Sequence, residues 1–327
     1  MSNIIKWGIA GPGAIANKFA TAIKNVKGAE LVAVASTSAQ RANDFAKKYD
    51  IPMSFSSYEE MAVSSDVDAV YISTAHTFHK PCAQSFLNAK KHVLCEKPVC
   101  VNSAHARELE ECARKNGVFL MEAMWTRFLP AIREAVKIVQ SGEIGDIRGV
   151  KADFCYYCSP EEDPKLYANE LAGGALLDVG IYGLTFASIF LGNNPVSIKS
   201  ISDIRDDADC HTNVLMKYEN GAIASLSCAI DVPKPADGYV YGTKGYIHLP
   251  DFYGAKDIYV CVGDERKHIS KPSVGDGFEE EIYEVCNCIR NGKLHSDIMP
   301  MSLSIKILEQ MDYIRNQIDL TYPCDRE

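Results

Sequence analysis

The sequence lacks the features of a nucleic-acid-binding or membrane protein. It has 34 Lys and Arg against 43 Asp and Glu, a formal net charge of -9 over 327 residues, and a negative surface repels phosphate backbones and anionic lipids. No apolar run approaches the roughly 20 residues of a membrane span. The first residues, "MSNIIKWGIAGPG", lead straight into an apolar strand pattern and show no secretion signal. We therefore expect no nucleic-acid partner and no membrane partner.

The 12 cysteines do not follow the spacing of a metal site. Cys155 and Cys158 form the pair "CYYC", but residues three apart on a strand point to opposite faces, and no second pair follows at zinc spacing. Cys286 and Cys288 belong to a helical pattern. The sequence therefore predicts no metal site. Because cysteines without a secretion signal indicate reduced thiols, we expect a cytoplasmic protein.

The first third of the chain alternates short apolar strands with amphipathic helices, a pattern typical of an α/β domain with a parallel sheet. The predicted strands are 5–10, 29–36, 68–74, 92–98 and 118–123, and the predicted helices are 16–26, 38–50, 57–64, 79–90 and 102–117. We find no internal repeat and no low-complexity segment. At about 150 residues per domain the length favours two domains, and we place the first at residues 1–123.

After residue 125 the pattern changes to long alternating strands. A helix over 130–145 precedes strands at 147–158, 196–204, 211–219, 222–230, 238–243, 245–249 and 257–264, with further helices at 173–191, 277–292 and 301–317. The turns "ENGA" and "GTKG" have hairpin composition, so we expect 211–219 and 222–230 to pair antiparallel. Residues 124–327 are predicted to form an α+β domain on a large, mostly antiparallel sheet.

The loop "GIAGPGAIANKF" follows the first strand and opens the first helix. Gly11 and Gly13 occupy the first two glycine positions of a dinucleotide-binding fingerprint, and Ala16 takes the third. The N–H groups at the helix start then bind a diphosphate. Two other interpretations remain open: a plain glycine turn, and an S-adenosylmethionine site. The strand before and the helix after the loop favour a nicotinamide dinucleotide.

The end of the second strand indicates which nicotinamide dinucleotide is bound. An acidic residue there would bind the ribose 2′-hydroxyl of NAD. This chain has Ser36, Thr37 and Ser38, with Arg41 on the next helix. Because no carboxylate is present to repel a 2′-phosphate, we favour NADP over NAD. Arg41 is equally consistent with an ordinary solvated helix charge.

A lysine stands at the end of the fourth long strand, in "VLCEKPVC". The residue before a proline is held in an extended conformation, which places Lys97 at the carboxyl end of a parallel strand. Ligands of such sheets bind beyond those ends, so Lys97 is predicted to reach the nicotinamide. The alternative is a surface lysine paired with Glu96.

The second half of the chain supplies an aspartate and a tyrosine in "AGGALLDVGIYGL". Asp178 and Tyr182 are four residues apart on a predicted helix and share one face. An aspartate among apolar residues needs a partner, and a lysine across a cleft would serve. The alternative for Tyr182 is a core tyrosine bonded to a carbonyl.

These side chains suit the oxidation of an alcohol, which needs a base for the hydroxyl proton. A free tyrosine has a pKa of about 10, and a nearby ammonium lowers it. A two-unit drop requires about 2.7 kcal/mol of differential interaction. Either Tyr182 or Lys97 could carry the proton, and the residues alone do not decide between them.

Taken together, "GPGAIA", "CEKP", "MEAMWTRFLP" and "GGALLDVGIYGL" resemble the Gfo/Idh/MocA oxidoreductase family over nearly the whole chain. The likeness is strongest to its dimeric dihydrodiol dehydrogenase and NADP-linked D-xylose dehydrogenase branch. The resemblance implies a Rossmann domain followed by an open-faced sheet domain that forms a homodimer. It also implies NAD(P)-dependent oxidation of a sugar, polyol or trans-dihydrodiol.

The resemblance also implies roles for individual residues. Lys97 would contact the nicotinamide ribose and the reacting hydroxyl, with a cis bond before Pro98, and Tyr182 would transfer the proton with Asp178 as a substrate contact. One departure from the branch is Thr37, where an arginine is common. The full predicted cofactor set is Gly11, Gly13, Ala14, Ile15, Ala16, Ser36, Thr37, Arg41, Thr74, His76, His79, Glu96, Lys97, Pro98, Trp125 and Arg127. The predicted substrate contacts are Tyr156, Tyr167, Asp178 and Tyr182.

The leading hypothesis is thus an NAD(P)-dependent dehydrogenase acting on CH–OH groups. Two other functions share this fold: a cofactor-binding regulator without turnover, and an NAD-dependent glycosidase. The exact substrate, its stereochemistry and the direction of the reaction do not follow from the sequence.

Overall fold

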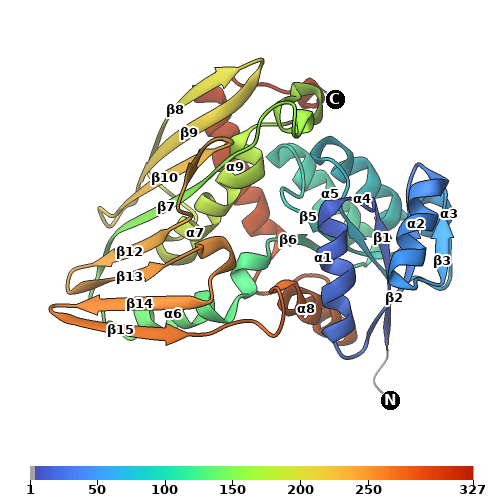
Figure 1. Ribbon diagram of the computed structural model, residues 1–327, viewed down its shortest axis with the longest axis horizontal. Coiled ribbons are helices and arrows are strands. Elements are labelled where there is room, and N and C mark those ends of the chain that lie inside the picture. Colours follow the sequence, from blue (N-terminus) through green and yellow to red (C-terminus); the bar gives the residue numbers. More distant parts are fainter. Residues whose placement is uncertain (1–3, 327) are drawn as a thin grey trace. The chain divides into compact units, whose positions relative to one another are not determined.

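The computed structural model describes residues 4–326 of the chain. Internal contacts divide it into two compact units. Unit 1 comprises the chain up to Trp125 together with Val274–Ile305, and unit 2 comprises Thr126–Ser273 together with the chain from Lys306 onward. The two units are described separately, and Figure 1 shows the elements of each.

Unit 1 contains a six-stranded parallel sheet, as predicted for a Rossmann domain. Its strands are β1 (Ile5–Ala10), β2 (Ala29–Ala35), β3 (Met53–Phe55), β4 (Ala69–Ile72), β5 (His92–Glu96) and β6 (Leu120–Ala123), in the order β3-β2-β1-β4-β5-β6. Every neighbouring pair is parallel. The order reverses between β1 and β4, and ligands of open α/β sheets bind where the order reverses.

The helices of unit 1 follow the predicted ranges closely. They are α1 (Ala14–Ala22), α2 (Ala39–Tyr49), α3 (Tyr58–Ala62), α4 (His79–Asn88) and α5 (Ser103–Asn116). Local signals explain their ends: the Ser38, Ser57 and Asn102 side chains accept from main-chain N–H groups at the starts of α2, α3 and α5. Gly117, with φ 67°, ends α5.

Helix α8 (Phe278–Arg290) also belongs to unit 1, although it follows the second sheet in the sequence. The amide of Asn25 donates to Glu279 at 3.0 Å, and the guanidinium of Arg290 donates to the carbonyl oxygen of Gly28 at 2.6 Å. We had grouped this helix with the second half of the chain. The functional division at residues 123 and 124 stays a prediction.

Unit 2 is built on a nine-stranded mixed sheet, most of whose strand pairs are antiparallel, as predicted. Its strands are β7 (Ile147–Tyr157), β8 (Ser197–Arg205), β9 (Ala208–Lys217), β10 (Ile223–Ala229), β11 (Asp231–Lys234), β12 (Gly238–Gly242), β13 (Gly245–Leu249), β14 (Asp257–Val262) and β15 (Glu265–Ser270). The order is β15-β14-β13-β12-β7-β10-β9-β8, with β11 beside β7. The predicted hairpin is confirmed as β9 and β10, while β10 runs parallel to β7.

One face of this sheet is apolar and carries helix α7 (Ile181–Leu191), which packs on β7 and β10. Buried side chains such as Val240, Ile247 and Val260 lie on that face. They alternate with a ladder of rings on the other face, in which Tyr239 stacks on His248 at 4.3 Å. Strands that alternate in this way leave one face for a core and one face open.

The remaining α-helices are α6 (Pro130–Gln140), and α9 (Met301–Gln317), which begins in unit 1 and continues into unit 2. Three short strands, β3, β11 and β15, were not predicted. Strand β15 reads "ERKHIS", and an edge strand of charged residues has no apolar period to reveal it.

One stretch, Asn169–Leu191, is long and apolar enough to cross a membrane by length and composition, which our sequence expectation had overlooked. Within the structure 78% of its most apolar window is buried. A buried core helix of a globular protein passes the same test, and this burial is what the packing of α7 on its sheet produces.

Candidate functional site

The glycine loop of unit 1 forms a cradle beside the end of β4. Gly11 has φ +90°, and a Cβ there would lie 3.1 Å from the carbonyl oxygen of Ser73. Helix α1 starts after Gly13 and receives no side-chain cap, so the N–H groups of its first turn, at Ala14, Ile15 and Ala16, have no local side-chain acceptor. An uncapped helix start next to a glycine turn fits a diphosphate.

Polar groups at the end of β4 adjoin this loop. The hydroxyl of Thr74 is buried and has no hydrogen-bond partner among the described residues. Its methyl group would lie 3.0 Å from a Cβ at Gly11. An orphaned buried hydroxyl is uncommon in a native structure. It therefore supports the prediction that Thr74 faces the cofactor, which stays a prediction.

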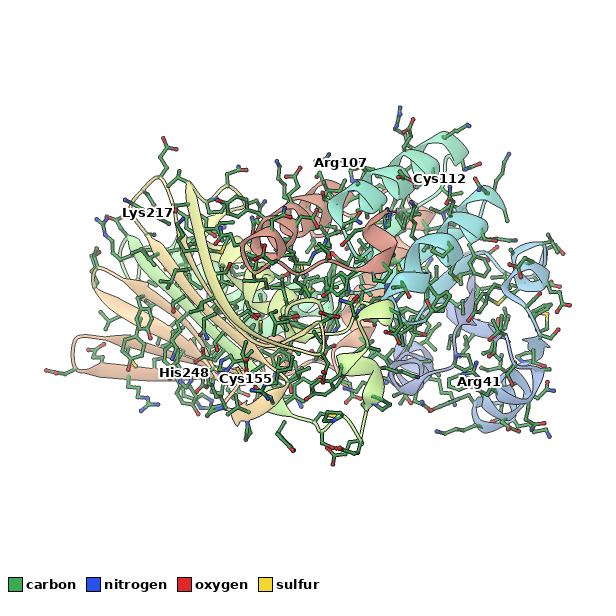
Figure 2. All side chains as sticks on the ribbon, turned by 90° about the horizontal axis from the view of Figure 1, so that it is seen from above. Arg41, Arg107, Cys112, Cys155, Lys217 and His248 are labelled. Atoms are coloured by element: carbon green, nitrogen blue, oxygen red, sulfur yellow. The ribbon has the colours of Figure 1, made fainter. Side chains whose placement is uncertain are left out.

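The turn between β2 and α2 is rich in hydroxyls and has one cation. Ser36 is buried, and its hydroxyl accepts from the N–H of Ser38 at 3.2 Å. The Arg41 guanidinium lies 3.4 Å from the hydroxyl of Thr37, to which it donates. Figure 2 shows Arg41 among the side chains of its unit. A guanidinium and hydroxyls gathered in this way suit a phosphate group. A ribose hydroxyl is normally bound by a carboxylate, and this turn has none.

The loop after β5 holds Lys97 between anchored neighbours. Glu96 is buried and accepts from the hydroxyl of Tyr71 at 2.5 Å and from the N–H of Lys97 at 3.1 Å. Burial raises the pKa of Glu96 above its ordinary value. The Lys97–Pro98 peptide bond is cis. Beyond it, the N–H of Val99 donates to Glu122 at 2.8 Å. The main chain on both sides of Lys97 is thus bonded to buried carboxyl groups.

His79 connects the ends of β4 and β5. It is fully enclosed, with Nδ1 2.7 Å from the carbonyl oxygen of Pro98 and Nε2 3.0 Å from that of Thr74. Burial, helped by the positive charges of His76 and Lys97, lowers the pKa of His79 to about 4 and outweighs the two carbonyl contacts. Both ring nitrogens face main-chain oxygens, and the neutral imidazole donates to only one of them. A role of His79 toward the cofactor would therefore act through the Thr74 and Pro98 segments.

In unit 2, Asp178 and Tyr182 lie on one continuous helical segment. Asp178 belongs to a π-helical turn, Leu176–Gly180, which runs directly into α7, and Tyr182 is the second residue of α7. The hydroxyl of Tyr156, on β7, donates to Asp178 at 2.6 Å. The sequence had suggested a lysine partner for Asp178. That lysine contact stays a prediction, and the pKa of Tyr156 is raised by burial and by the neighbouring carboxylate.

Tyr182 forms an aromatic wall together with Phe154 and Tyr253. Tyr182 is 7% exposed, its ring lies 5.3 Å from that of Phe154 and 6.0 Å from that of Tyr253, and Phe154 stacks on Tyr253 at 4.2 Å. The sequence analysis missed Tyr253, which follows β13 in the loop "DFYGAK". The one signal in the sequence is the aromatic pair Phe252 and Tyr253 in the loop after that strand.

The remaining predicted residues lie in several places. Tyr167 donates to the carbonyl oxygen of Cys158 at 2.6 Å, and burial raises its pKa to about 12. Trp125 is buried and stacks on Phe278 at 5.2 Å. Arg127 donates to the hydroxyl of Ser188 on α7 at 3.1 Å. His76 lies beside His79, with ring centres 5.8 Å apart. Their contacts with a ligand stay predictions.

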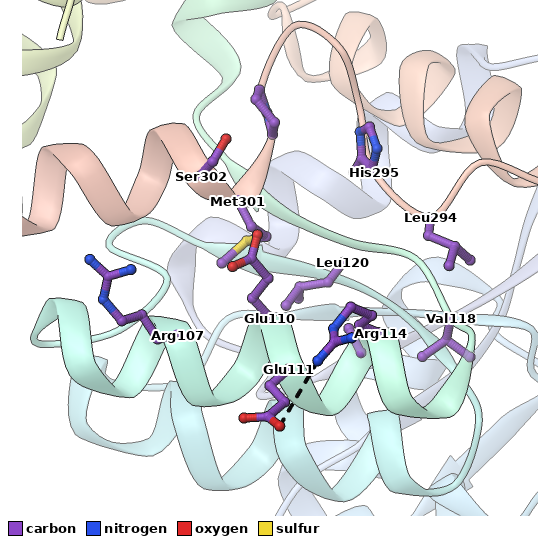
Figure 3. Close-up of a pocket in the computed structure, with 12 residues that line it drawn as sticks. Arg107, Glu110, Glu111, Arg114, Val118, Leu120, Leu294, His295, Met301 and Ser302 are labelled. Carbon is purple, nitrogen blue, oxygen red and sulfur yellow. Dashed lines mark ion pairs between the residues drawn. The ribbon is translucent and has the colours of Figure 1, made fainter.

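Unit 1 also has a surface cavity of about 600 Å³ along α5, in which charged side chains face an apolar floor (Figure 3). Its lining includes Arg107, Arg114, Leu120, His295 and Met301, and no predicted site residue. Among residues 4–326, no group of three His, Cys, Asp or Glu residues is arranged to hold a metal ion. Neither feature alters the candidate site.

Comparison with known proteins gives a consistent result. Residues 5–124 match the GFO/IDH/MocA oxidoreductase family, described as having an NAD-binding Rossmann fold, and residues 132–248 match the GFO/IDH/MocA C-terminal domain. Curated relatives include the trans-1,2-dihydrobenzene-1,2-diol dehydrogenases of Mus musculus and Homo sapiens. These are 36% and 35% identical to this chain, over 98% of it and 99% of each relative.

Solved structures extend the likeness to the fold. A 3-ketoreductase from Actinomadura kijaniata, in complex with NADP and TDP-benzene, has a TM-score of 0.88 at 25% identity and covers 97% of this chain and 98% of its own. An aldose-aldose oxidoreductase from Caulobacter crescentus has a TM-score of 0.88 at 24% identity, over 96% of this chain and 97% of its own. The second likeness shows the fold alone.

The enclosed, neutral His79 predicts a pH-dependent stability. Its pKa is about 4 when folded, against an ordinary 6.5, so the unfolded chain binds a proton first as the pH falls. The stability that the neutral ring contributes is complete above pH 6.5 and is lost between pH 6.5 and 4, by about 3 kcal/mol in total. Denaturant unfolding of wild type and His79→Gln at several pH values should show their difference shrinking over that range. A difference that does not vary with pH would contradict this prediction.

Proposed function

Because the chain belongs to the GFO/IDH/MocA oxidoreductase family, we propose that it is an NADP-dependent dehydrogenase of trans-dihydrodiols. The family membership makes it an NAD(P)-dependent oxidoreductase acting on CH–OH groups, with a small-molecule substrate. The observation that carries the finer proposal is the aromatic wall of Phe154, Tyr182 and Tyr253 beside an aspartate. It offers flat apolar surface and polar groups together, as an unsaturated cyclic diol requires.

The residues of unit 1 fit a nicotinamide dinucleotide. The uncapped start of α1 and the Gly11 turn would hold the diphosphate, and Thr37 with Arg41 would hold the 2′-phosphate of NADP. The cofactor, when bound, accepts or supplies the hydride. Lys97, Thr74 and the segments that His79 connects are proposed to line its nicotinamide end. Residues 1–123 would thus bind the dinucleotide, and residues 124–327 the substrate.

Tyr182 and Lys97 are proposed to manage the proton of the reacting hydroxyl. Tyr182 is enclosed by rings, and a phenol in such surroundings ionises only when a cation stabilises the phenolate. We propose that the Lys97 ammonium is the cation that stabilises the Tyr182 phenolate. Asp178, oriented by the hydroxyl of Tyr156, would accept a hydrogen bond from a substrate hydroxyl, which suits a substrate with two adjacent hydroxyl groups.

A homodimer through the open sheet face of unit 2 is also proposed. That face carries the exposed apolar residues Ile201, Leu215 and Ile223 on β8 to β10, each more than half exposed at 73%, 54% and 51%. The ring ladder of Tyr239, Tyr241, Tyr246 and His248 continues it on β12 and β13; His248 is labelled in Figure 2. Contiguous exposed apolar surface marks an interaction site.

A cytoplasmic location is proposed on the state of the thiols. Among residues 4–326, none of the 12 cysteines forms a disulfide. Several, including Cys95, Cys100 and Cys228, are buried, and burial raises their thiol pKa values well above the ordinary value. Cysteines in this number without disulfides, several of them buried, are typical of a reducing compartment.

The first prediction of the proposed function concerns turnover. With NADP and a panel of trans-dihydrodiols and aldoses, absorbance at 340 nm should rise for a dihydrodiol, and Tyr182→Phe and Lys97→Met should each lower kcat at least 100-fold. The double variant should be little worse than either single variant, because residues acting on one proton are not additive.

The competing functions predict other results. Absence of turnover across the panel would favour a non-catalytic regulator, and release of sugar from a glycoside without accumulation of NADPH would favour a glycosidase. Preference for an aldose would overturn the dihydrodiol assignment alone. Retention of wild-type kcat in both single variants would remove Tyr182 and Lys97 from the reaction.

The second prediction concerns the choice of cofactor. Thr37→Glu places a carboxylate where the 2′-phosphate is proposed to lie, and Arg41→Ala removes the cation beside it. We expect each change to lower kcat/KM for NADP about 10-fold or more, and Thr37→Glu to raise kcat/KM for NAD. Steady-state kinetics with both cofactors measures this. An unchanged preference ratio in Thr37→Glu would show that the turn does not contact the 2′ group.

The third prediction concerns assembly. Leu215→Lys and Tyr241→Lys each place a charge on the open sheet face, and we expect the pair of changes to convert a dimer to a monomer in light-scattering measurements. The matched control is Tyr313→Lys on α9, where Tyr313 is 50% exposed outside the sheet. A wild-type protein that is monomeric at micromolar concentration would refute the homodimer.

A further inference from the structure

The helical segment that carries Asp178 and Tyr182 has no local cap. It opens in "AGGALL", residues 172–177, where no Ser, Thr, Asp or Asn stands before the first turn. The N–H groups of a first turn need acceptors, and a helix usually finds one in its own N-cap side chain. Here the first residues contribute no side-chain hydrogen bond. The acceptor must come from elsewhere in the fold.

Asp209, on β9, supplies that acceptor. Its Oδ2 accepts from the N–H of Leu176 at 2.8 Å, although the two residues are 33 positions apart. The same oxygen accepts from the hydroxyl of Thr212 at 2.8 Å. Asp209 is 0% exposed. A carboxylate at the start of a helix is also favoured by the helix dipole, so Asp209 acts as a cap delivered by the sheet.

Gly174 makes room for this contact. It has φ +118°, and a Cβ there would lie 2.1 Å from Oδ1 of Asp209. The carbonyl oxygen of Gly174 accepts from the N–H of Asp178 at 3.2 Å. The residue that Asp209 packs against therefore makes the main-chain bond that places Asp178. Any side chain at position 174 would push the carboxyl group or the turn away.

The neighbouring residue of the turn is held as well. Tyr322 is buried and donates to the carbonyl oxygen of Gly173 at 3.0 Å. The guanidinium of Arg315 lies over the ring of Tyr322 at 4.9 Å and donates to Asp325 at 2.6 Å. The Gly173–Gly174 turn is thus fixed from two directions, by Asp209 and by Tyr322.

Keeping a carboxyl group at this place is costly. Burial raises the pKa of Asp209 to about 7, against the opposing effect of its bonds to Thr212 and Leu176. Its Oδ1 has no hydrogen-bond partner in the described part of the chain. An apolar residue of similar size would avoid this cost. A carboxyl group that stands here in spite of this desolvation cost favours a specific positioning role.

We propose that Asp209 is a positioning residue for the reaction: it fixes the first turn of the segment that presents Asp178 and Tyr182. This inference rests on the function proposed above, in which those two residues contact the substrate. Asp209 itself does not contact the substrate in this scheme. Its loss should disturb the chemical step rather than the binding of the cofactor.

The test uses Asp209→Leu, which has a similar shape and removes both acceptor oxygens, in the full-length protein with NADP. We expect kcat to fall 10-fold or more while the Kd for NADP changes less than two-fold. The primary deuterium isotope effect on kcat should rise toward its limiting value, because a misplaced base slows the chemical step. Amide hydrogen exchange without substrate should accelerate within residues 174–184 and stay at wild-type rates in unit 1.

A second variant covers the case in which Asp209→Leu does not fold. Thr212→Val removes one donor to the carboxylate and keeps the shape, and we expect a three- to ten-fold loss of kcat with faster exchange in the same segment. The matched control is Ser304→Ala, since Ser304 is buried and its hydroxyl has no partner among the described residues. It should behave as wild type.

Two outcomes would overturn the inference. One is wild-type kcat and isotope effect in a folded Asp209→Leu or Thr212→Val protein. The other is a loss spread equally over NADP affinity, turnover and exchange in both units, which indicates a purely structural role. Failure of the proposed function is recognised separately, because Tyr182→Phe would then keep its activity, whereas the exchange experiment on Asp209 needs no substrate.

Discussion

The unpaired N–H groups at the start of a helix are the constraint on which both parts of the site depend. Each helix begins with donors that its own main chain cannot satisfy. Helix α1 begins after Gly13 without a side-chain cap, so its donors remain available for an anion. The segment with Asp178 begins after Gly174, also without a local cap, and there Asp209 closes the position. Two glycine turns thus have opposite proposed roles: one leaves donors for the cofactor, and the other fixes the segment that carries Asp178 and Tyr182.

Around the first turn, buried polar residues bond to main chain beside side chains that are proposed to contact the ligand. His79 spans the carbonyl oxygens of Thr74 and Pro98, Glu96 accepts from the N–H of Lys97, and Glu122 accepts from that of Val99. Each contact ends on the backbone beside a proposed site residue. Substituting any of these three residues should therefore displace the main chain beside a proposed site residue. Enclosed titratable groups that gather at one loop in this way are typical of a functional site.

The sequence predicted much of this because its signals are local. The Rossmann strands and helices, the glycine loop, the lysine before a proline, and the β9–β10 hairpin all follow from residues adjacent in the chain. The missed features depend on tertiary contacts. Helix α8 joins unit 1 through Asn25 and Arg290, the ring of Tyr253 in the loop after β13 lies 6.0 Å from that of Tyr182, and Tyr156 donates to Asp178. No periodicity encodes such pairs.

The same distinction explains why Asp209 was invisible in the sequence. It lies at the start of a strand, "ADCHTNVLMK", where an acidic residue normally marks a solvent-exposed end. Only the fold shows that its side chain turns inward to a helix 33 residues earlier. A local N-cap would have fixed the helix to its own preceding turn. A cap delivered from β9 fixes it to the sheet that also carries Phe154 and Tyr156. Asp178, Tyr182 and the rings beside them are thereby fixed relative to one sheet. The proposed reaction requires this, because catalysis is sensitive to small displacements.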